Sequence, residues 1–304
     1  MGSEMCIRDR MKGSDGKVAK KTWFDYLNIT LLFLFAVICL YPMIYVLACS
    51  FATDSDYIKG GIYLWPHDVT IQNYLTVIKD SRLWRSYGVT FARTIIGTIT
   101  SLLYTAIVGY AMSRTNLRGR NIFYKIFIFT MFFSGGTVPY YLVIVSLKLF
   151  NNFLVYIIPS LFSVYNMLVF SNFFKSIPEE IRESAVMDGA SEFKIFGSII
   201  MPLSMPVVST VGLWIAVGHW NSFYDTMLYT TNTKLWTLQY YLMKVIKESS
   251  GKIIAGMPAE MIGNISAETV SFAAIIISVI PILVVYPLIF KMLTKGVVIG
   301  SLKG

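Results

Sequence analysis

The chain has 304 residues, of which 55% are hydrophobic and only 14% are charged, and its mean hydropathy is +0.62. This composition excludes an ordinary soluble domain, in which about a quarter of the residues are charged, and favours a polytopic membrane protein. The net charge of +9 does not indicate nucleic-acid binding, because the Lys and Arg residues are spread between apolar stretches instead of forming one patch with aromatic residues.

The N-terminal residues differ in character from the rest of the chain. Residues 1–10, MGSEMCIRDR, match nothing downstream and are interpreted as a non-native extension, with the natural start at Met11. Residues 1–22 are expected to form an N-terminal tail, and residues 23–304 a single transmembrane domain. The cysteines Cys6, Cys39 and Cys49 do not have the spacing of a disulfide framework or a metal site.

Six stretches have the roughly 20 apolar residues that a helix needs to cross a bilayer core about 30 Å thick. They predict an all-α polytopic membrane protein with six transmembrane helices, at Asn28–Phe51, Tyr87–Met112, Ile122–Leu147, Val155–Phe174, Leu203–Tyr224 and Thr269–Leu293. Several contain proline, which membrane helices tolerate where neighbouring groups satisfy the freed carbonyls. The first stretch could alternatively be a cleaved lipoprotein-type signal, but it is longer than the apolar region of about 7–15 residues in such signals.

The distribution of basic residues sets the expected orientation. If the N-terminus is cytoplasmic, the cytoplasmic flanks hold more Lys and Arg residues than the outer loops, whose charges lie mostly in two longer loops where the rule has little weight. Both termini are therefore expected in the cytoplasm. Short interfacial helices are expected in the outer loops, within LWPHDVTIQNYLTVI and at Leu235–Ile246.

Two polar side chains in the predicted spans have more than one interpretation. Arg93 could extend from the outer end of its helix to water, or it could line a polar path across the membrane. His219 could serve a proton relay, but its neighbours Trp220 and Asn221 favour a packed or path-lining histidine.

A polar segment, Ser176–Pro202, separates the fourth and fifth predicted spans. Ser176 and Glu179 have the spacing of a capping box, and Pro178 fits the first turn of a helix. An apolar stripe with helical spacing runs through Ile181, Ala185, Gly189, Phe193, Phe196 and Ile200.

The polar segment is expected to bend at Gly189, and Pro202 is expected to end it and open the next span. The pattern predicts a helix that docks on a partner. The alternative is a helix that lies on the bilayer surface, although anionic headgroups would repel its acidic residues.

The polar segment resembles a known signature. Glu183-Ser184-Ala185, three residues, Gly189, nine residues and Ile199-Ile200-Met201-Pro202 are similar to the E-A-A, x3, G, x9, I-x-L-P pattern of ABC importer permeases. Ser184 and Met201 depart from this pattern by conservative changes.

The resemblance covers about residues 20–304 and is strongest to the maltose-transport type in the carbohydrate-uptake group. Gly109-Tyr110-Ala111-Met112-Ser113-Arg114 is similar to the A-Y-x-(L/M)-S-R motif of that group, and Lys295-Gly296-x3-Gly300-x2-Lys303-Gly304 to its C-terminal tail. Phe133-Ser134-Gly135-Gly136, followed by Pro139, and Gly218-His219-Trp220-Asn221-Ser222 resemble the subgroup that imports complex or oligomeric saccharides.

The resemblance implies that the polar segment is a cytoplasmic coupling helix, between spans 4 and 5, that inserts into a groove of a nucleotide-binding subunit. The expected coupling positions are Glu183, Ser184, Ala185, Asp188, Gly189, Ile199 and Pro202. Aromatic faces and amides are the groups that orient sugars, so the expected substrate-pathway residues are Asn166, Trp214, His219, Trp220, Asn221 and Tyr224. Interfacial or helix-packing roles are the alternative for these residues.

The expected function is a permease subunit of an ABC importer for a sugar or oligosaccharide in the bacterial plasma membrane. The expected partners are a second permease subunit, two ABC ATPase subunits, an extracytoplasmic solute-binding protein and membrane lipid, but no nucleic acid. The chain lacks the G-x4-G-K-(S/T) phosphate loop, so ATP and Mg²⁺ are expected on the partner ATPase, with no catalytic residue, cofactor or metal on this chain.

The sequence leaves three alternatives to this function to be considered. One is the same permease role for a non-sugar solute. Another is a non-transporting membrane receptor or scaffold, which would not need the signature. An intramembrane enzyme would need paired acids or a His/Cys cluster within the spans, and the sequence has neither.

Overall fold

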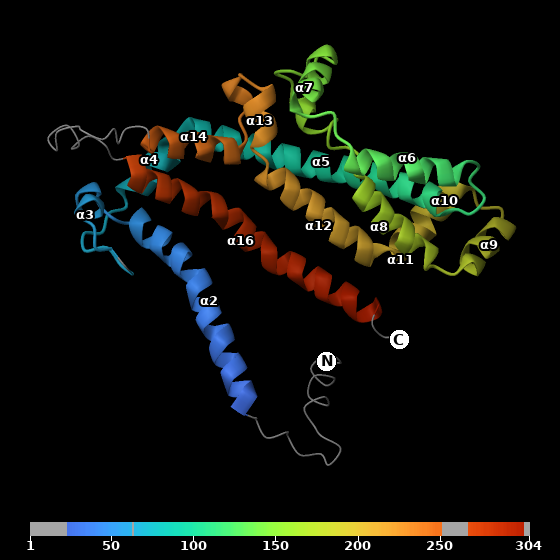
Figure 1. Cartoon of the computed structure of the whole chain (residues 1–304), viewed down its shortest axis with the longest axis horizontal. Helices are drawn as coiled ribbons and strands as arrows, with labels where there is room; N and C mark the ends of the chain where they lie inside the picture. The colour runs from blue at the N-terminus through green and yellow to red at the C-terminus, as the bar shows by residue number, and fades with distance from the viewer. Residues whose placement is uncertain (1–22, 63, 251–266, 301–304) are drawn as a thin grey trace. The chain divides into compact units, whose positions relative to one another are not determined.

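The computed structural model of the chain describes residues 23–62, 64–250 and 267–300 (Figure 1). These residues form helices joined by turns and loops, with an isolated antiparallel bridge between Ala52 and Val69. The chain divides into one unit that ends at Thr70 and another that begins at Ile71. The predicted tail at 1–22 and the last two residues of the C-terminal motif, Lys303 and Gly304, lie outside the described residues.

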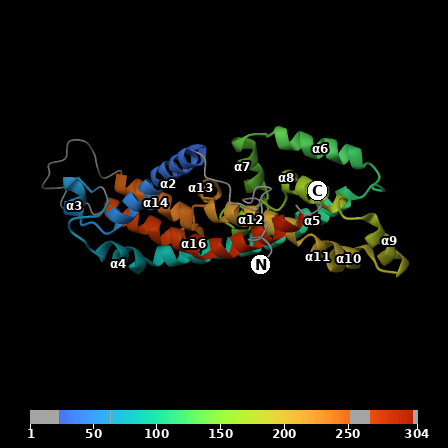
Figure 2. The same ribbon diagram turned by 90° about the horizontal axis from the view of Figure 1, so that it is seen from below.

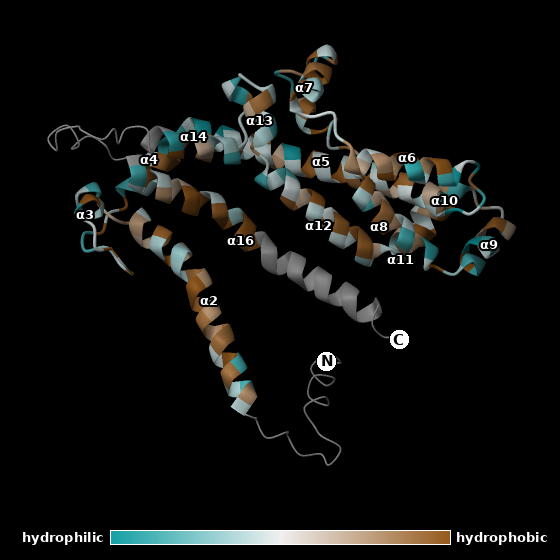
Figure 3. Ribbon diagram, in the orientation of Figure 1, coloured by the Kyte–Doolittle hydropathy of each residue, from teal (hydrophilic) through white to brown (hydrophobic). Residues whose placement is uncertain are grey.

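The first unit contains α2 (Trp23–Ser50) and the short helix α3 (Asp54–Lys59). Helix α2 corresponds to the first predicted span, and hydrophobic residues cover most of its length (Figure 3), where almost all of its large apolar side chains are exposed. The buried Asp56 of α3 accepts hydrogen bonds from the backbone N–H groups of two residues in the loop that follows, His67 (2.8 Å) and Asp68 (3.2 Å).

The second unit is built around α5, which packs against α8, α12 and α14, while α16 packs against α4, α12 and α14. Helices α4 and α9 lie at opposite ends of this unit (Figures 1 and 2). Its elements in chain order are α4 (Gln72–Lys79), α5 (Ser81–Ser113), α6 (Arg120–Phe132), α7 (Thr137–Ser146), η1 (Phe153–Tyr156), α8 (Val164–Lys175), α9 (Glu179–Met187), α10 (Glu192–Ile195), η2 (Phe196–Ile200), α11 (Met201–Leu203), α12 (Met205–Asn221), α13 (Tyr224–Tyr229), η3 (Thr233–Leu235), α14 (Leu238–Ser250) and α16 (Ala267–Gly300).

Three of the six predicted spans are continuous helices. These are α2, α5 and α16, and α14 is the helix predicted at Leu235–Ile246. The side chain of Asp80 caps the start of α5 by accepting a hydrogen bond from the N–H of Arg82 (2.8 Å). In the described part of the chain, α2 and α5 are long and apolar enough to cross a membrane, and the number rises to four if each of two bent helix pairs is one span.

The other three predicted spans are wrong as continuous helices. The third is divided into α6 and α7, which meet at 113° around a break where Gly136 has a φ of 85°. The fourth contains only the short turn η1 and the 12-residue helix α8, separated by an irregular stretch that includes Pro159. Glycine in the left-handed region and proline both interrupt a helix, which explains the two breaks.

The fifth predicted span begins and ends differently from the prediction. Pro202 does not end the polar segment, because it lies within α11. The break falls at Ser204, where the helix that ends at Leu203 and α12 meet at 84°. Helix α12 ends at Asn221, so Tyr224 begins the next short helix, α13.

Gly109 allows α5 and α8 to approach closely. A Cβ atom at this position would lie 2.7 Å from Cβ of Phe170 and 3.2 Å from the carbonyl oxygen of Met167. Both of these residues are fully buried. Small residues at a helix contact let the backbones come together, which explains a glycine here.

We expect Gly109→Ala to lower the free energy of unfolding by about 1–3 kcal/mol, because the added methyl group must displace atoms held by α8. Gly88→Ala is the matched control on the same helix. It has no atom within 4 Å of its Cβ position, so it should be neutral or slightly stabilising. Thermal unfolding of the purified chain in detergent measures both variants, and equal melting temperatures would contradict the close contact at Gly109.

Candidate functional site

The polar segment folds into two helical parts joined by a tight turn. Helix α9 ends in a Schellman motif, in which the N–H of Gly189 donates to the carbonyl of Val186 (2.9 Å) and that of Ala190 to the carbonyl of Ala185 (3.0 Å). Gly189 has a φ of 78°, in the left-handed region that favours glycine. The predicted bend at Gly189 is therefore confirmed.

The predicted capping box at the start of α9 is wrong. The hydroxyl of Ser176 donates to the carbonyl of Phe173 (2.7 Å) in the preceding helix, and Pro178 takes the N-cap position without a side-chain cap. The carboxylate of Glu179 pairs instead with Arg114 and Arg182. Two arginine partners explain why this carboxylate does not turn back to the helix start.

The predicted apolar stripe is correct only in part. Ala185 and Ile200 are buried, but Phe193 is 83% exposed, and the fully buried residue of α10 is Ile195. The turn at Gly189 separates the two helices, so one helical period cannot continue from α9 into α10. Met187, at the end of α9, is 87% exposed, so two large apolar side chains of the segment face outward.

Charged and polar side chains tie the polar segment to the C-terminal end of α5. Arg114, the C-cap residue of α5, forms an ion pair with Glu179. Arg182 contacts the carboxylates of Glu179 (3.1 Å) and Glu192 (2.6 Å), and the hydroxyl of Tyr110 donates to Glu192 (2.8 Å). These contacts were not predicted from the sequence, although Tyr110 and Arg114 both belong to the motif at Gly109–Arg114.

The pKa of Glu192 is lowered from its usual value of 4.5. Burial alone would raise the pKa of this carboxyl group, but hydrogen bonds from Tyr110 and Arg182 and the positive charge of Arg182 outweigh that effect. The stabilisation from these contacts is therefore complete above pH 4.5, and it is lost as the pH falls through the lowered pKa of the folded protein.

We expect α10 to loosen as the pH falls through the lowered pKa of Glu192, which lies below 4.5, because protonated Glu192 no longer pairs with Arg182. Hydrogen exchange of a peptide covering residues 188–196, corrected for the intrinsic effect of pH, measures this opening. In the Glu192→Gln variant, the same peptide should exchange faster at neutral pH and should show no further increase in exchange as the pH falls. An increase of the same size in that variant would contradict the assignment to Glu192.

The coupling positions predicted from the sequence lie in different environments. Glu183, Ser184, Asp188 and Gly189 are exposed, and so is Pro202. Ala185 is only 8% exposed and Ile199 is half-buried, and both contribute to the core between the polar segment, α5, α8 and α12. Their role in coupling stays a prediction.

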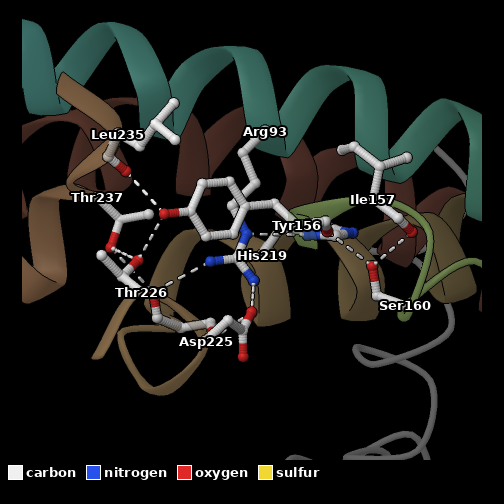
Figure 4. Close-up of polar contacts among 10 residues, drawn as sticks. Arg93, Tyr156, Ile157, Ser160, His219, Asp225, Thr226, Leu235 and Thr237 are labelled. Carbon is white, nitrogen blue, oxygen red and sulfur yellow. Dashed lines mark hydrogen bonds and ion pairs between the residues drawn. The ribbon is translucent and has the colours of Figure 1, made fainter. Parts of the chain in front are cut away.

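Arg93 is buried in the second unit and is surrounded by partners (Figure 4). Its side chain is 2% exposed and forms an ion pair with Asp225. Nε donates to Nδ1 of His219 (3.3 Å), another guanidinium nitrogen donates to the carbonyl of Ser222 (3.4 Å), and the guanidinium carbon lies 4.8 Å from the ring centre of Tyr156. We call these five residues the arginine cluster.

The arginine cluster corrects one interpretation of Arg93. The side chain does not extend toward water, because carboxylate, carbonyl and imidazole acceptors are already beside it in the protein. Asp225 and Tyr156 were not predicted from the sequence as partners of Arg93. The available signal was a carboxylate directly after the fifth predicted span, on a helix other than that of Arg93.

His219 and Trp220 point into the packed interior. His219 is 4% exposed, and a Cβ atom at Gly97 of α5 would overlap its ring. Trp220 is 7% exposed, and its ring meets that of Phe91 edge-on at 5.1 Å. This is the packed arrangement that the sequence analysis gave as an alternative to a substrate contact.

The other predicted pathway residues do not form one group. Trp214 is exposed and its ring lies 5.9 Å from that of Tyr165, while Asn166 is half-buried in the first turn of α8. Asn221 lines a separate cavity beside α14 and α16. Tyr224 lines a cavity next to the arginine cluster. A substrate-pathway role for these residues stays a prediction.

The cavity next to the arginine cluster has a volume of about 440 Å³. We call it the tyrosine cavity, since four tyrosines contribute to its wall. It is lined by Ser134, Gly136, Thr137, Tyr140, Val155, Tyr156, Pro159, Ser160, Tyr224, Asp225 and Tyr229. Within residues 23–62, 64–250 and 267–300, no group of three or more His, Cys, Asp and Glu residues could hold a metal ion.

Comparison with known proteins relates the whole arrangement to transport systems. Residues 104–299 match the family model described as "Binding-protein-dependent transport system inner membrane component". The chain is 35% identical, over 94% of its own length and 100% of the relative's, to the polygalacturonan/rhamnogalacturonan transport system permease protein YtcP of Bacillus subtilis. It is 27% identical, over 89% and 94%, to the trehalose/maltose transport system permease protein MalG of Thermococcus litoralis.

A solved structure shows a similar fold. A chain of a bacterial ABC transporter involved in the import of the acidic polysaccharide alginate superposes with a TM-score of 0.80 and 33% sequence identity. The similarity covers 88% of this chain and 95% of that one.

Proposed function

The chain belongs to the family of binding-protein-dependent transport system inner membrane components, and from this membership we propose that it is a permease subunit that imports a sugar or oligosaccharide. Relatives named for polygalacturonan, trehalose or maltose, and alginate support a saccharide cargo. The resemblance of the polar segment to the ABC permease signature supports the same role.

We further propose a bacterial plasma-membrane protein with six spans and both termini in the cytoplasm. The spans would be α2, α5, the bent pair α6–α7, the stretch from η1 through α8, α12 and α16. Several of these are shorter than the bilayer core and depend on neighbouring chains to cover their exposed backbone. Helix α9 would then lie at the cytoplasmic end of the second unit, and α4 at the outer end.

The anchoring of the polar segment is the single structural observation that carries the proposed coupling role. The segment presents Met187 and Phe193 outward while Arg114, Arg182 and Tyr110 hold it to α5. A partner that binds the exposed side can therefore move α5 without first ordering a loose loop. We propose that this partner is one of two ABC ATPase subunits, which bind ATP and Mg²⁺, and that α9 and the Gly189 turn form the coupling contact.

The remaining partners follow from the same proposal. A second permease subunit would complete the path across the membrane, and an extracytoplasmic binding protein would deliver the substrate. Tyr224 and the tyrosine cavity are the part of this chain best suited to meet a sugar, because aromatic faces and hydroxyl groups line a concave surface there.

The test is reconstitution of the chain with partner subunits encoded by adjacent genes. ATP hydrolysis should rise when a binding protein loaded with the correct saccharide is added. A panel of binding proteins and glycans identifies the cargo. If no glycan stimulates hydrolysis while another solute does, the saccharide assignment is wrong and the permease assignment stands.

A further inference from the structure

The tyrosine cavity presents one formal charge to a ligand. Asp225 is the only charged residue in the cavity wall among the residues that the structure describes, and the other polar groups there are hydroxyls. The rings of Tyr140 and Tyr229 lie 6.3 Å apart, and Tyr224 is 47% exposed. The wall therefore combines aromatic faces with a single carboxylate.

One oxygen of this carboxylate is satisfied within the protein and the other is available. Oδ2 of Asp225 accepts hydrogen bonds from the guanidinium group of Arg93 and from the hydroxyl of Ser222 (3.1 Å). No described residue donates a hydrogen bond to Oδ1, and the side chain of Asp225 is 31% exposed. An exposed carboxylate oxygen is a strong acceptor for a hydroxyl group of a ligand.

The guanidinium group of Arg93 pairs with Asp225 but is not part of the cavity wall, so it does not reach a ligand there. The arginine side chain is 2% exposed, and its donors already serve Asp225, His219 and Ser222. The ring of Tyr156 lies over the guanidinium group and also lines the cavity. The ion pair therefore turns its negative end toward the cavity.

We propose that the tyrosine cavity is a saccharide subsite that selects an uncharged sugar ring over a uronate, with Asp225 as the specificity-determining residue. The inference rests on the proposed permease function. A hydroxyl group of a neutral sugar donates to Oδ1 of Asp225 while its C–H face packs against a tyrosine ring. A uronate would instead place its carboxylate against Asp225, with no cation in the described wall to pair with it.

The proposed preference for an uncharged sugar is opposite to the charge of the cargo named for a structural relative. That relative imports the acidic polysaccharide alginate. The volume of about 440 Å³ lies within the range of roughly 300–1,000 Å³ that is typical of small-molecule sites. The shared fold thus leaves the charge of the cargo to be set by a few wall residues.

The experiment compares matched neutral and acidic sugars on the full chain in lipid nanodiscs. The probes are trigalacturonate and its carboxyl-reduced trigalactoside, and trimannuronate and its carboxyl-reduced trimannoside, titrated by saturation-transfer NMR. In at least one pair, we expect the neutral sugar to bind about ten-fold or more tightly than the acid. Asp225→Asn should reduce this ratio of affinities to about three-fold or less, because the acidic sugar then binds more tightly.

Two further variants separate the charge of Asp225 from other effects. Asp68→Asn removes an exposed carboxylate outside the cavity and should leave the ratio unchanged. Because Asp225→Asn leaves Arg93 buried without its ion pair, the double variant R93Q/D225N is measured beside it and should lose the same discrimination. Size-exclusion chromatography confirms that each variant is monodisperse before titration.

Each other result overturns the inference. Acids that bind as tightly as their neutral partners, or a ratio that Asp225→Asn and the double variant leave unchanged, would exclude Asp225 as the selecting residue. Failure of all four sugars to bind the wild-type chain would exclude the saccharide subsite. These titrations do not measure ATPase stimulation in the reconstituted importer, so the permease function is tested by a separate experiment.

Discussion

Replacement of Gly189 by valine is expected to lower substrate-stimulated ATP hydrolysis of the assembled importer by about ten-fold or more. Gly189 has a φ of 78°, which costs an L-residue roughly 1–2 kcal/mol and a β-branched residue more. The Schellman motif would therefore open, and α10 would lose its position relative to α9. The chain should still insert into the membrane, because the change lies in a polar connection between spans.

Gly189→Asn is the matched control for this substitution. A Cβ atom at Gly189 would have no neighbour within 4 Å, so the size of the side chain is not a limit there. Asparagine tolerates the left-handed region better than other non-glycine residues and should retain ATPase stimulation within about three-fold. If the valine and asparagine variants were equally active, or equally inactive, the backbone conformation of Gly189 would not be the determinant of coupling.

Separation of Arg93 from Asp225 should cause the largest loss of stability. Either Arg93→Met or Asp225→Leu leaves one buried or partly buried charge without its partner, which we expect to lower the free energy of unfolding by about 3–5 kcal/mol. The double variant R93M/D225L removes both charges and should be considerably more stable than the sum of the two single changes predicts. Denaturant unfolding in detergent completes this double-mutant cycle.

A partly exposed Arg–Asp pair at the start of the same helix provides the control. Arg82 contacts Asp80 at 3.0 Å, and the side chain of Arg82 is 56% exposed. Loss of an exposed ion pair costs about 1 kcal/mol or less, so Arg82→Met should have a small effect. If Arg93→Met were no more destabilising than Arg82→Met, or if the cycle showed no coupling, the interior ion pair would not contribute to stability as we infer.

The long helices and the bend of the polar segment could be predicted because their signals are local. Continuous apolar runs predict α5 and α16, and a glycine at position 189 predicts a turn because glycine readily adopts a left-handed backbone conformation. The breaks around Gly136 and Ser204 were missed because apolar composition satisfies the requirement for a span whether or not the helix is straight. Proline and glycine were visible there, but neither alone specifies a bend of 113° or 84°.

The arginine cluster could not be predicted because its contacts are distant in the sequence. Arg93 and Asp225 are separated by 132 positions, and Asp225 lies just beyond the predicted end of its span. A buried arginine requires an acceptor, but only the fold decides which carboxylate supplies it. The contact of Glu192 with Tyr110 was missed for the same reason, since these residues are 82 positions apart.

Helix α5 is one unbroken rod of 33 residues that carries Arg93 in its first half and Arg114 at its end. At a rise of 1.5 Å per residue, these two arginines lie about 30 Å apart along the axis. A straight helix without a proline or an internal break bends little, so a push on one end reaches the other as a tilt of the whole rod. We therefore expect the two ends of α5 to move at the same time and not one after the other.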